Sequence, residues 1–229
     1  GNLVGSWEAL GLLPRRGFQI MLANVLAVFP NTKVLFSIRN PLDRLPSAYL
    51  QALSAVSKHA KHHTFPRGTV FVEFDDWLRT KRSWKIHDTR FDFEDNFRLA
   101  VDVLGRDRVG IFLQEELRHD HRAFFCNVAE FVGVDGQIAR EIPNELWNLA
   151  ISSSQVDYLR AIELGDPKEK ELFLNASSAD RREWLQSALE GKALERHRIS
   201  LTSDQAEFIS DKSKNLNRFI AETFELDLK

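Results

Sequence analysis

The stretch Lys33-Val-Leu-Phe-Ser-Ile-Arg-Asn-Pro-Leu-Asp-Arg-Leu-Pro-Ser-Ala-Tyr49 indicates a short apolar strand, a tight turn and then a helix. Val34 to Ile38 is a near-continuous apolar run between polar flanks, which is typical of a strand covered on both faces in a parallel sheet. Asp43 can cap the helix, which we expect to run to about Ser57 with Pro46 in its first turn. The stretch therefore predicts one strand–turn–helix step of an α/β fold.

A second step of the same kind follows along the chain. Phe91 to Leu104 has helical spacing, Val109 to Leu113 indicates another buried strand, and His121 to Phe131 indicates a helix. Two such steps predict an α/β fold with an open parallel sheet. From Ile142 onward no strand is indicated, so we expect a helical C-terminal third and one domain over residues 1–229. The other helices that we expect span Gly17–Phe29, Phe71–Arg79, Ser154–Leu164, Ser178–Leu189 and Ser203–Phe224.

The composition narrows the class of protein. The 229 residues are 43% hydrophobic, which supports a large core, and 31 Lys and Arg nearly balance 33 Asp and Glu. This balance argues against a nucleic-acid binder that works by bulk electrostatics. One cysteine excludes an internal disulfide, and no apolar run is long enough to span a membrane. We therefore expect a soluble, cytoplasmic protein without a transmembrane segment.

The start of the first predicted helix is a candidate phosphate site. A helix start offers unpaired N–H groups and a partial positive charge. Arg39 ends the strand, and Ser47 follows eight positions later, so a guanidinium fork and a hydroxyl can converge there. The alternative is a strand-end arginine paired to a neighbouring carboxylate, with the serine simply part of a helix.

These residues resemble the 3′-phosphate-binding segment of sulfotransferases that use 3′-phosphoadenosine 5′-phosphosulfate (PAPS). That segment is a strand, an Arg-Asn-Pro turn and a serine eight positions after the arginine. The Asp-Arg pair and the Ser-x-Tyr ending are similar to the carbohydrate and bacterial branch. Three further stretches resemble later parts of the family: Phe93-Glu-Asp-Asn-Phe97 through Val109-Gly-Ile-Phe-Leu-Gln-Glu-Glu-Leu-Arg-His-Asp120, Val128-Ala-Glu-Phe-Val-Gly-Val134 and Asn215–Leu228.

The resemblance implies an α/β fold of three layers, a parallel sheet flanked by helices, as in P-loop NTPases. It also implies transfer of a sulfuryl group from PAPS to a hydroxyl or amine, with 3′,5′-ADP (PAP) as the product and no metal. It implies that Arg39 and Ser47 bind the 3′-phosphate of the donor. It also implies that Lys192, Arg196 and Arg198 contact the same phosphate, although a solvated basic loop is the alternative. The expected acceptor is a glycan or small alcohol, and a homodimer stays open.

The chain departs from the family at one important element. The family carries an upstream strand–loop–helix of the type Pro-Lys-Ser-Gly-Thr, which binds the 5′-phosphosulfate. Neither Gly1–Gly5 nor Gly11–Gly17 has that pattern. We expect that residues upstream of Gly1 are missing or that the chain is a degenerate relative. The alternatives to an enzyme of this family are a non-catalytic sulfotransferase-like binding module and a nucleotide kinase of similar fold.

Other polar residues are weaker candidates. Glu115 and Glu116 follow a predicted strand, where open α/β sheets gather ligands. One of them as a catalytic base is one interpretation, and the resemblance implies a structural anchor instead. His59, His62 and His63 lack a nearby Cys or acidic ligand, so we expect a surface loop and no metal there.

Overall fold

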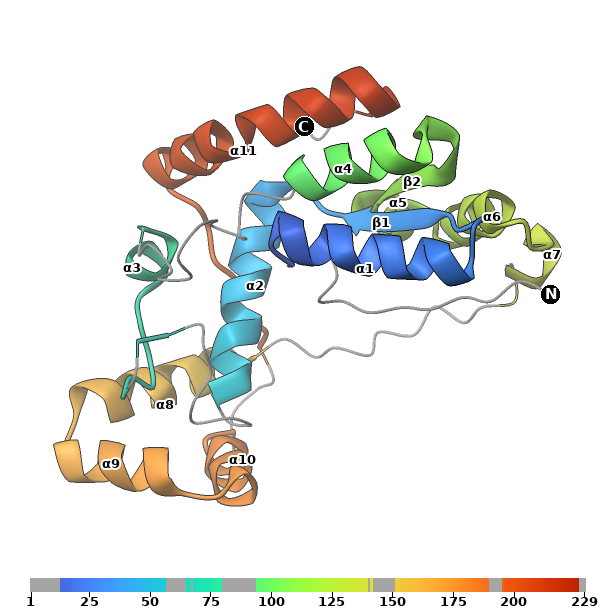
Figure 1. The fold of residues 1–229 in the computed structure, drawn as a ribbon. Coiled ribbons are helices and arrows are strands. Elements are labelled where there is room, and N and C mark those ends of the chain that lie inside the picture. The colour runs from blue at the N-terminus through green and yellow to red at the C-terminus, as the bar shows by residue number, and fades with distance from the viewer. Residues whose placement is uncertain are drawn as a thin grey trace. The chain divides into compact units, whose positions relative to one another are not determined.

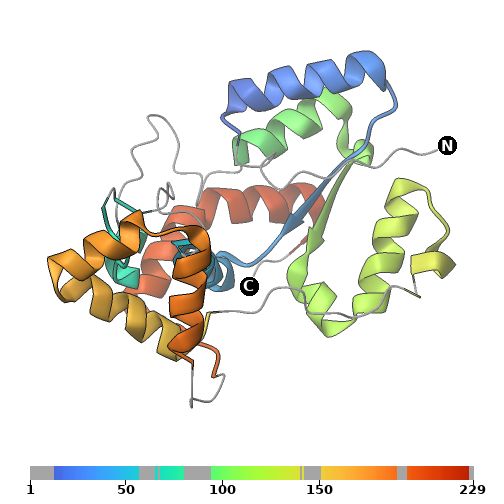
Figure 2. The same ribbon diagram turned by 90° about the horizontal axis from the view of Figure 1, so that it is seen from below.

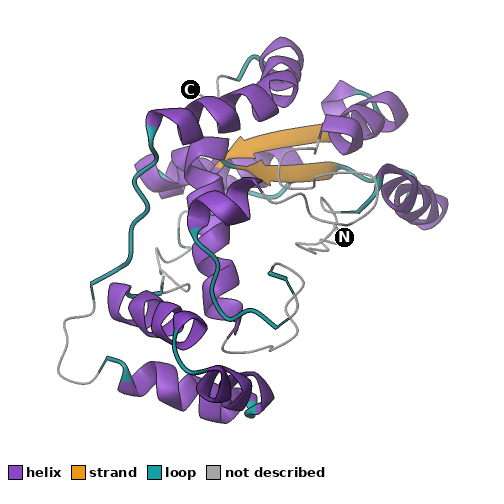
Figure 3. Ribbon diagram, turned by 90° about the vertical axis from the view of Figure 1, so that its left-hand side faces the viewer, coloured by secondary structure: helices purple, strands orange, loops and turns teal. Residues whose placement is uncertain are grey.

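The computed structural model describes residues 13–56, 65–66, 68–79, 94–139, 141, 151–189 and 195–226. These residues are mostly helical and include one short parallel sheet, in agreement with the α/β class (Figures 1 and 3). The elements are α1 (Arg15–Val28), β1 (Val34–Ile38), α2 (Pro41–Val56), α3 (Phe74–Arg79), α4 (Glu94–Leu104), η2 (Arg106–Arg108), β2 (Val109–Leu113), α5 (Gln114–His119), α6 (His121–Val132), α7 (Gly136–Ala139), α8 (Ser153–Leu164), α9 (Pro167–Asn175), α10 (Ser178–Ser187) and α11 (Ser203–Phe224).

The chain divides into two compact units. Unit 1 comprises Gly1–Pro41, Trp84–Glu145 and Glu207–Lys229, and unit 2 comprises Leu42–Ser83 and Leu146–Ala206. Each unit is therefore assembled from segments far apart in the sequence. The helices of the described part do not include one that is both long and apolar enough to cross a membrane.

Unit 1 is built on the parallel pair of β1 and β2, which runs in register from Val34 opposite Val109 to Ile38 opposite Leu113. One face of the pair packs against α1, α4 and the C-terminal part of α11. Phe36 of β1 lies at the centre of this core, and its ring centroid is 4.2 Å from that of Phe97 in α4. The apolar period of each strand and helix thus closes one contiguous core.

The opposite face of β2 packs against α6. The Phe112 ring lies edge-on to Phe124 and Phe131, with centroids 5.9 Å and 5.8 Å apart. Gly110 makes this approach possible, because a Cβ atom there would lie 2.9 Å from the Phe131 ring. Helices therefore cover both faces of the described strand pair, as the near-continuous apolar runs predict, with α6 opposite α1 and α4 (Figure 2).

Unit 2 is helical and contains the body of α2 with α3, α8, α9 and α10. Tyr49 of α2 packs among aromatic rings, including Phe74 and Trp77, and donates a hydrogen bond of 2.6 Å to the Val72 carbonyl. Burial, together with the negative charge of Glu73, raises the pKa of Tyr49 above its usual value. Trp77 and Leu78 of α3 are buried in the same core.

Several helix boundaries differ from the expectation. We expected Phe71–Arg79 to be helical, but α3 begins at Phe74. The reason is that the Glu163 carboxylate accepts hydrogen bonds from the N–H groups of Val70 and Phe71, at 2.7 Å and 3.3 Å, and holds this segment outside the helix.

The helices α5, α7 and α9 were not expected. For α9 the sequence carries a signal, because Asp166 caps the helix by accepting from the Lys168 N–H and Pro167 occupies its first turn. The predicted span Ser203–Phe224 is confirmed. Thr202 caps this helix and exchanges hydrogen bonds with Gln205.

Candidate functional site

The β1–α2 junction is the strand–turn–helix step that the sequence predicts. β1 ends at Ile38 and α2 begins at Pro41, so Arg39 and Asn40 form the turn. Pro41 suits the first helical position, because its fixed φ is already helical and its missing N–H would have no partner there. Arg39 is half-buried at this carboxyl end of β1. The junction therefore places the positively charged side chain of Arg39 at the edge where open parallel sheets bind ligands.

A carboxylate from α5, the helix that directly follows β2, reaches this turn. The Asn40 backbone N–H donates a hydrogen bond of 2.9 Å to Oε1 of Glu115, in the first turn of α5. Glu115 is half-buried, and its Oε2 is shielded from solvent without a hydrogen-bond donor in the described chain. This contact agrees with the structural-anchor interpretation of Glu115, while Glu116 is exposed.

The contact changes the physical basis of the anion site. We expected the helix start to offer unpaired N–H groups, but the N–H that precedes α2 already binds a carboxylate. A phosphate near this turn would therefore depend on side-chain donors more than on that backbone group. A guanidinium has five N–H donors, so Arg39 can bind a phosphate while it keeps other contacts.

Ser47 lies on α2, is exposed and belongs to unit 2, whereas Arg39 belongs to unit 1. The expectation that Pro46 lies in the first turn is wrong, because α2 begins at Pro41 and Pro46 falls inside the helix. Pro46 cannot donate an N–H to the carbonyl of Leu42, which weakens the helix just before Ser47.

Two of the predicted basic residues lie in the segment that precedes α11, which is held by backbone pairing. Lys192 lies outside the described residues, while Arg196 and Arg198 are exposed in unit 2. The loop is tied to the start of α8 by an isolated bridge between Ser152 and Arg196 and by the bond from the His197 N–H to the Ile151 carbonyl, 3.1 Å long. This backbone pairing holds Arg196 and Arg198 in an extended segment. His59, His62 and His63 lie outside the described residues.

A shallow hollow of about 410 Å³ adjoins Glu115 in unit 1. Asp120 at its rim accepts hydrogen bonds from the N–H groups of Ala123 and Arg122 and caps α6. The Ala123 N–H is the main cause that lowers the pKa of Asp120 below its usual value. The hollow is lined by Glu115, Glu116, His119, Asp120, Ala123, Phe124 and Asn127.

Two polar contacts were not foreseen from the sequence. The Asn40–Glu115 bond joins residues 75 positions apart, so no local signal marks it. His197 Nδ1 lies 3.3 Å from Ser153 Oγ in unit 2, and neither residue belongs to a recognisable sequence motif.

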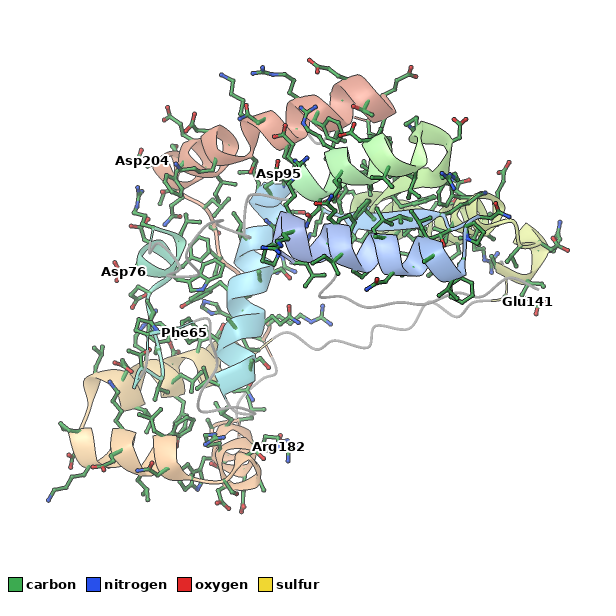
Figure 4. All side chains as sticks on the ribbon, viewed as in Figure 1. Phe65, Asp76, Asp95, Glu141, Arg182 and Asp204 are labelled. Carbon is green, nitrogen blue, oxygen red and sulfur yellow. The ribbon has the colours of Figure 1, made fainter. Side chains whose placement is uncertain are left out.

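Within the described residues, no group of three or more His, Cys, Asp and Glu side chains is arranged to hold a metal ion. Figure 4 shows the charged side chains, among them Asp95, which pairs with Arg15 at 3.3 Å.

Comparison of the chain with protein-family models, with curated proteins and with solved structures gives no match.

Proposed function

We propose that this protein binds PAPS through the β1–α2 junction and transfers its sulfuryl group to an acceptor hydroxyl or amine of a glycan or small alcohol. The observation that carries the proposal is the half-buried Arg39 between β1 and a helix that begins at Pro41, with Ser47 eight positions on. In this proposal the Arg39 guanidinium and the Ser47 hydroxyl bind the 3′-phosphate of the donor.

The parallel pairing of β1 and β2 supports the proposal. Parallel strands bring their carboxyl ends to one edge, which is where α/β folds bind nucleotides. Helices on both faces of the pair are compatible with the three-layer sulfotransferase fold, which we include in the proposal. Arg196 and Arg198 are proposed as further contacts to the 3′-phosphate, because both are exposed on a backbone-anchored loop.

The chemistry needs little covalent participation by the protein. Sulfuryl transfer resembles phosphoryl transfer, in which positioning and electrostatic stabilisation provide most of the rate enhancement. Bound PAPS supplies the activated sulfuryl group. The described residues would then hold the nucleotide and neutralise part of its charge.

Calorimetry with 3′,5′-ADP, 5′-AMP and ATP tests the proposal, because only the first carries a 3′-phosphate. We expect wild-type protein to prefer 3′,5′-ADP. Arg39→Ala should weaken the binding of 3′,5′-ADP about 10- to 150-fold, since a charge-assisted hydrogen bond is worth roughly 1.5–3 kcal/mol. The binding of 5′-AMP should not change.

Arg122→Ala is the matched control, since Arg122 is an exposed arginine on α6 of the same unit. Equal binding of 3′,5′-ADP by Arg39→Ala and wild type would refute the assignment of Arg39. Turnover of labelled PAPS with glycan and alcohol acceptors separates an enzyme from a binding module. Preference for ATP would favour the kinase alternative.

A further inference from the structure

Asn40 and Glu115 occupy equivalent places beyond the two paired strands. The last residue pair of the sheet is Ile38 opposite Leu113. Two residues beyond the end of each strand lie Asn40, after β1, and Glu115, after β2. The 2.9 Å hydrogen bond from the Asn40 N–H to Glu115 Oε1 therefore continues the cross-strand pairing through a side chain.

This hydrogen bond constrains Arg39. The N–H of Asn40 belongs to the planar peptide unit that joins Arg39 to Asn40, so its direction sets the ψ angle of Arg39. On the other side, Pro41 restricts Asn40 to extended conformations. The turn is thus defined from both ends, by a proline ring and by a carboxylate, and Arg39 leaves the strand in one direction.

The bond is also of the stronger kind. A carboxylate that accepts from a backbone N–H makes a charge-assisted hydrogen bond, and loss of its partner leaves a shielded polar group unsatisfied. Glu115 Oε2 receives no hydrogen bond from the described part of the chain, so Oε1 carries the polar contact that fixes this side chain.

We propose that Glu115 is a positioning residue, which orients the Arg39–Pro41 turn so that the Arg39 guanidinium meets the 3′-phosphate of a nucleotide. The proposal rests on the proposed function and assigns the role to the acceptor atom Oε1, not to the negative charge. A negative charge beside a phosphate site is unfavourable for the ligand, so the useful property of Glu115 is the hydrogen bond that its Oε1 accepts. Proton abstraction from an acceptor hydroxyl is the competing role.

Three substitutions in the full chain separate these roles. Glu115→Gln keeps an acceptor oxygen and removes the charge, Glu115→Asp keeps the charge and withdraws it by one methylene, and Glu115→Ala removes both. Glu116→Ala is the control, because Glu116 is exposed in the same turn. Three properties are measured: amide hydrogen exchange of Asn40 by NMR without ligand, the Kd for 3′,5′-ADP, and the turnover of PAPS.

We expect Glu115→Ala and Glu115→Asp to accelerate Asn40 exchange and to weaken 3′,5′-ADP binding, each about tenfold, as the loss of one charge-assisted hydrogen bond predicts. Glu115→Gln should stay within about threefold of wild type in Asn40 exchange and in 3′,5′-ADP binding, because an amide oxygen still accepts the bond. Glu116→Ala should change neither. If Glu115→Ala fails to fold, the contrast between the Gln and Asp variants decides.

Unchanged Asn40 exchange in the Asp and Ala variants would overturn the positioning role. So would a Gln variant as impaired in 3′,5′-ADP binding as the Ala variant. A Gln variant that binds 3′,5′-ADP normally but has lost turnover would assign proton abstraction to Glu115 instead. If the wild type itself does not bind 3′,5′-ADP, the proposed function fails and the ligand part of this proposal fails with it, whereas the exchange contrast still decides whether Glu115 orients the turn.

Discussion

The β1–α2 and β2–α5 junctions begin at paired strand ends, yet they are built differently. The first is a two-residue turn with Arg39, followed by a helix of 16 residues. The second has no turn, and a helix of six residues starts directly after β2 with Glu115 in its first turn. The β1–α2 junction carries the Arg39 guanidinium, and the β2–α5 junction supplies the Glu115 oxygen that accepts a hydrogen bond from the first junction. The conformation of the β1–α2 turn thus depends on a side chain that follows the neighbouring strand.

Both junctions depend on the strand pair beneath them. Phe36 is 8% exposed and packs against Phe97 and Phe18. Phe36→Ala should lower the free energy of unfolding by about 3–5 kcal/mol, because it removes a buried ring and leaves a cavity. Urea denaturation measures the change. The substitution should also disturb both junctions alike, since neither strand end would keep its place.

The control for this variant is Ile20→Ala on α1, where the side chain is 53% exposed. We expect it to change the free energy of unfolding by less than about 0.5 kcal/mol. A loss in Phe36→Ala no larger than that of Ile20→Ala would contradict the central place of Phe36 in the unit 1 core.

Much of this architecture could be predicted from local pattern. The spans Val34–Ile38 and Val109–Leu113 were found as strands because each is a short apolar run with polar ends. The sequence of α9 does not predict a helix by its period, because it is charged and shows no clear apolar stripe, although Asp166-Pro167 is a start signal.

The candidate site was only partly predictable for a different reason. Arg39 and Ser47 follow from a spacing within one segment, and Glu115 stood out because it follows a strand. The bond that joins Glu115 to Asn40 depends on the register of two strands 75 residues apart, which no local pattern contains. The same limit applies to Glu163, whose carboxylate decides where α3 begins.

Ser47→Ala changes the β1–α2 junction and leaves the β2–α5 junction as it is. We expect 3′,5′-ADP to bind about five- to tenfold more weakly, which corresponds to one hydrogen bond of roughly 1 kcal/mol. The fold should not be destabilised, because Ser47 is exposed and alanine favours a helix. Calorimetry measures the affinity, with Ser210→Ala on α11 as the matched exposed serine. Wild-type affinity in Ser47→Ala would mean that the phosphate is bound without this hydroxyl.

Asp120→Asn changes the cap of α6, directly after α5, and has the smallest expected effect at neutral pH, since asparagine also caps helices well. The pKa of Asp120 is lowered in the folded protein, chiefly by the Ala123 N–H, so its ionised form is favoured by folding. That contribution is present above the unfolded pKa of about 3.9 and is lost as the pH falls through the lowered folded pKa. In thermal melts from pH 7 downward, wild type should therefore have a higher Tm than Asp120→Asn at neutral pH, and the difference in Tm should shrink below about pH 4.

Asp102→Asn, at an exposed site on α4, is the control and should show no such change of the Tm difference with pH. A difference between wild type and Asp120→Asn that stays constant down to the acid limb would mean that the charge of Asp120 does not stabilise the start of α6, and that its oxygen alone forms the cap.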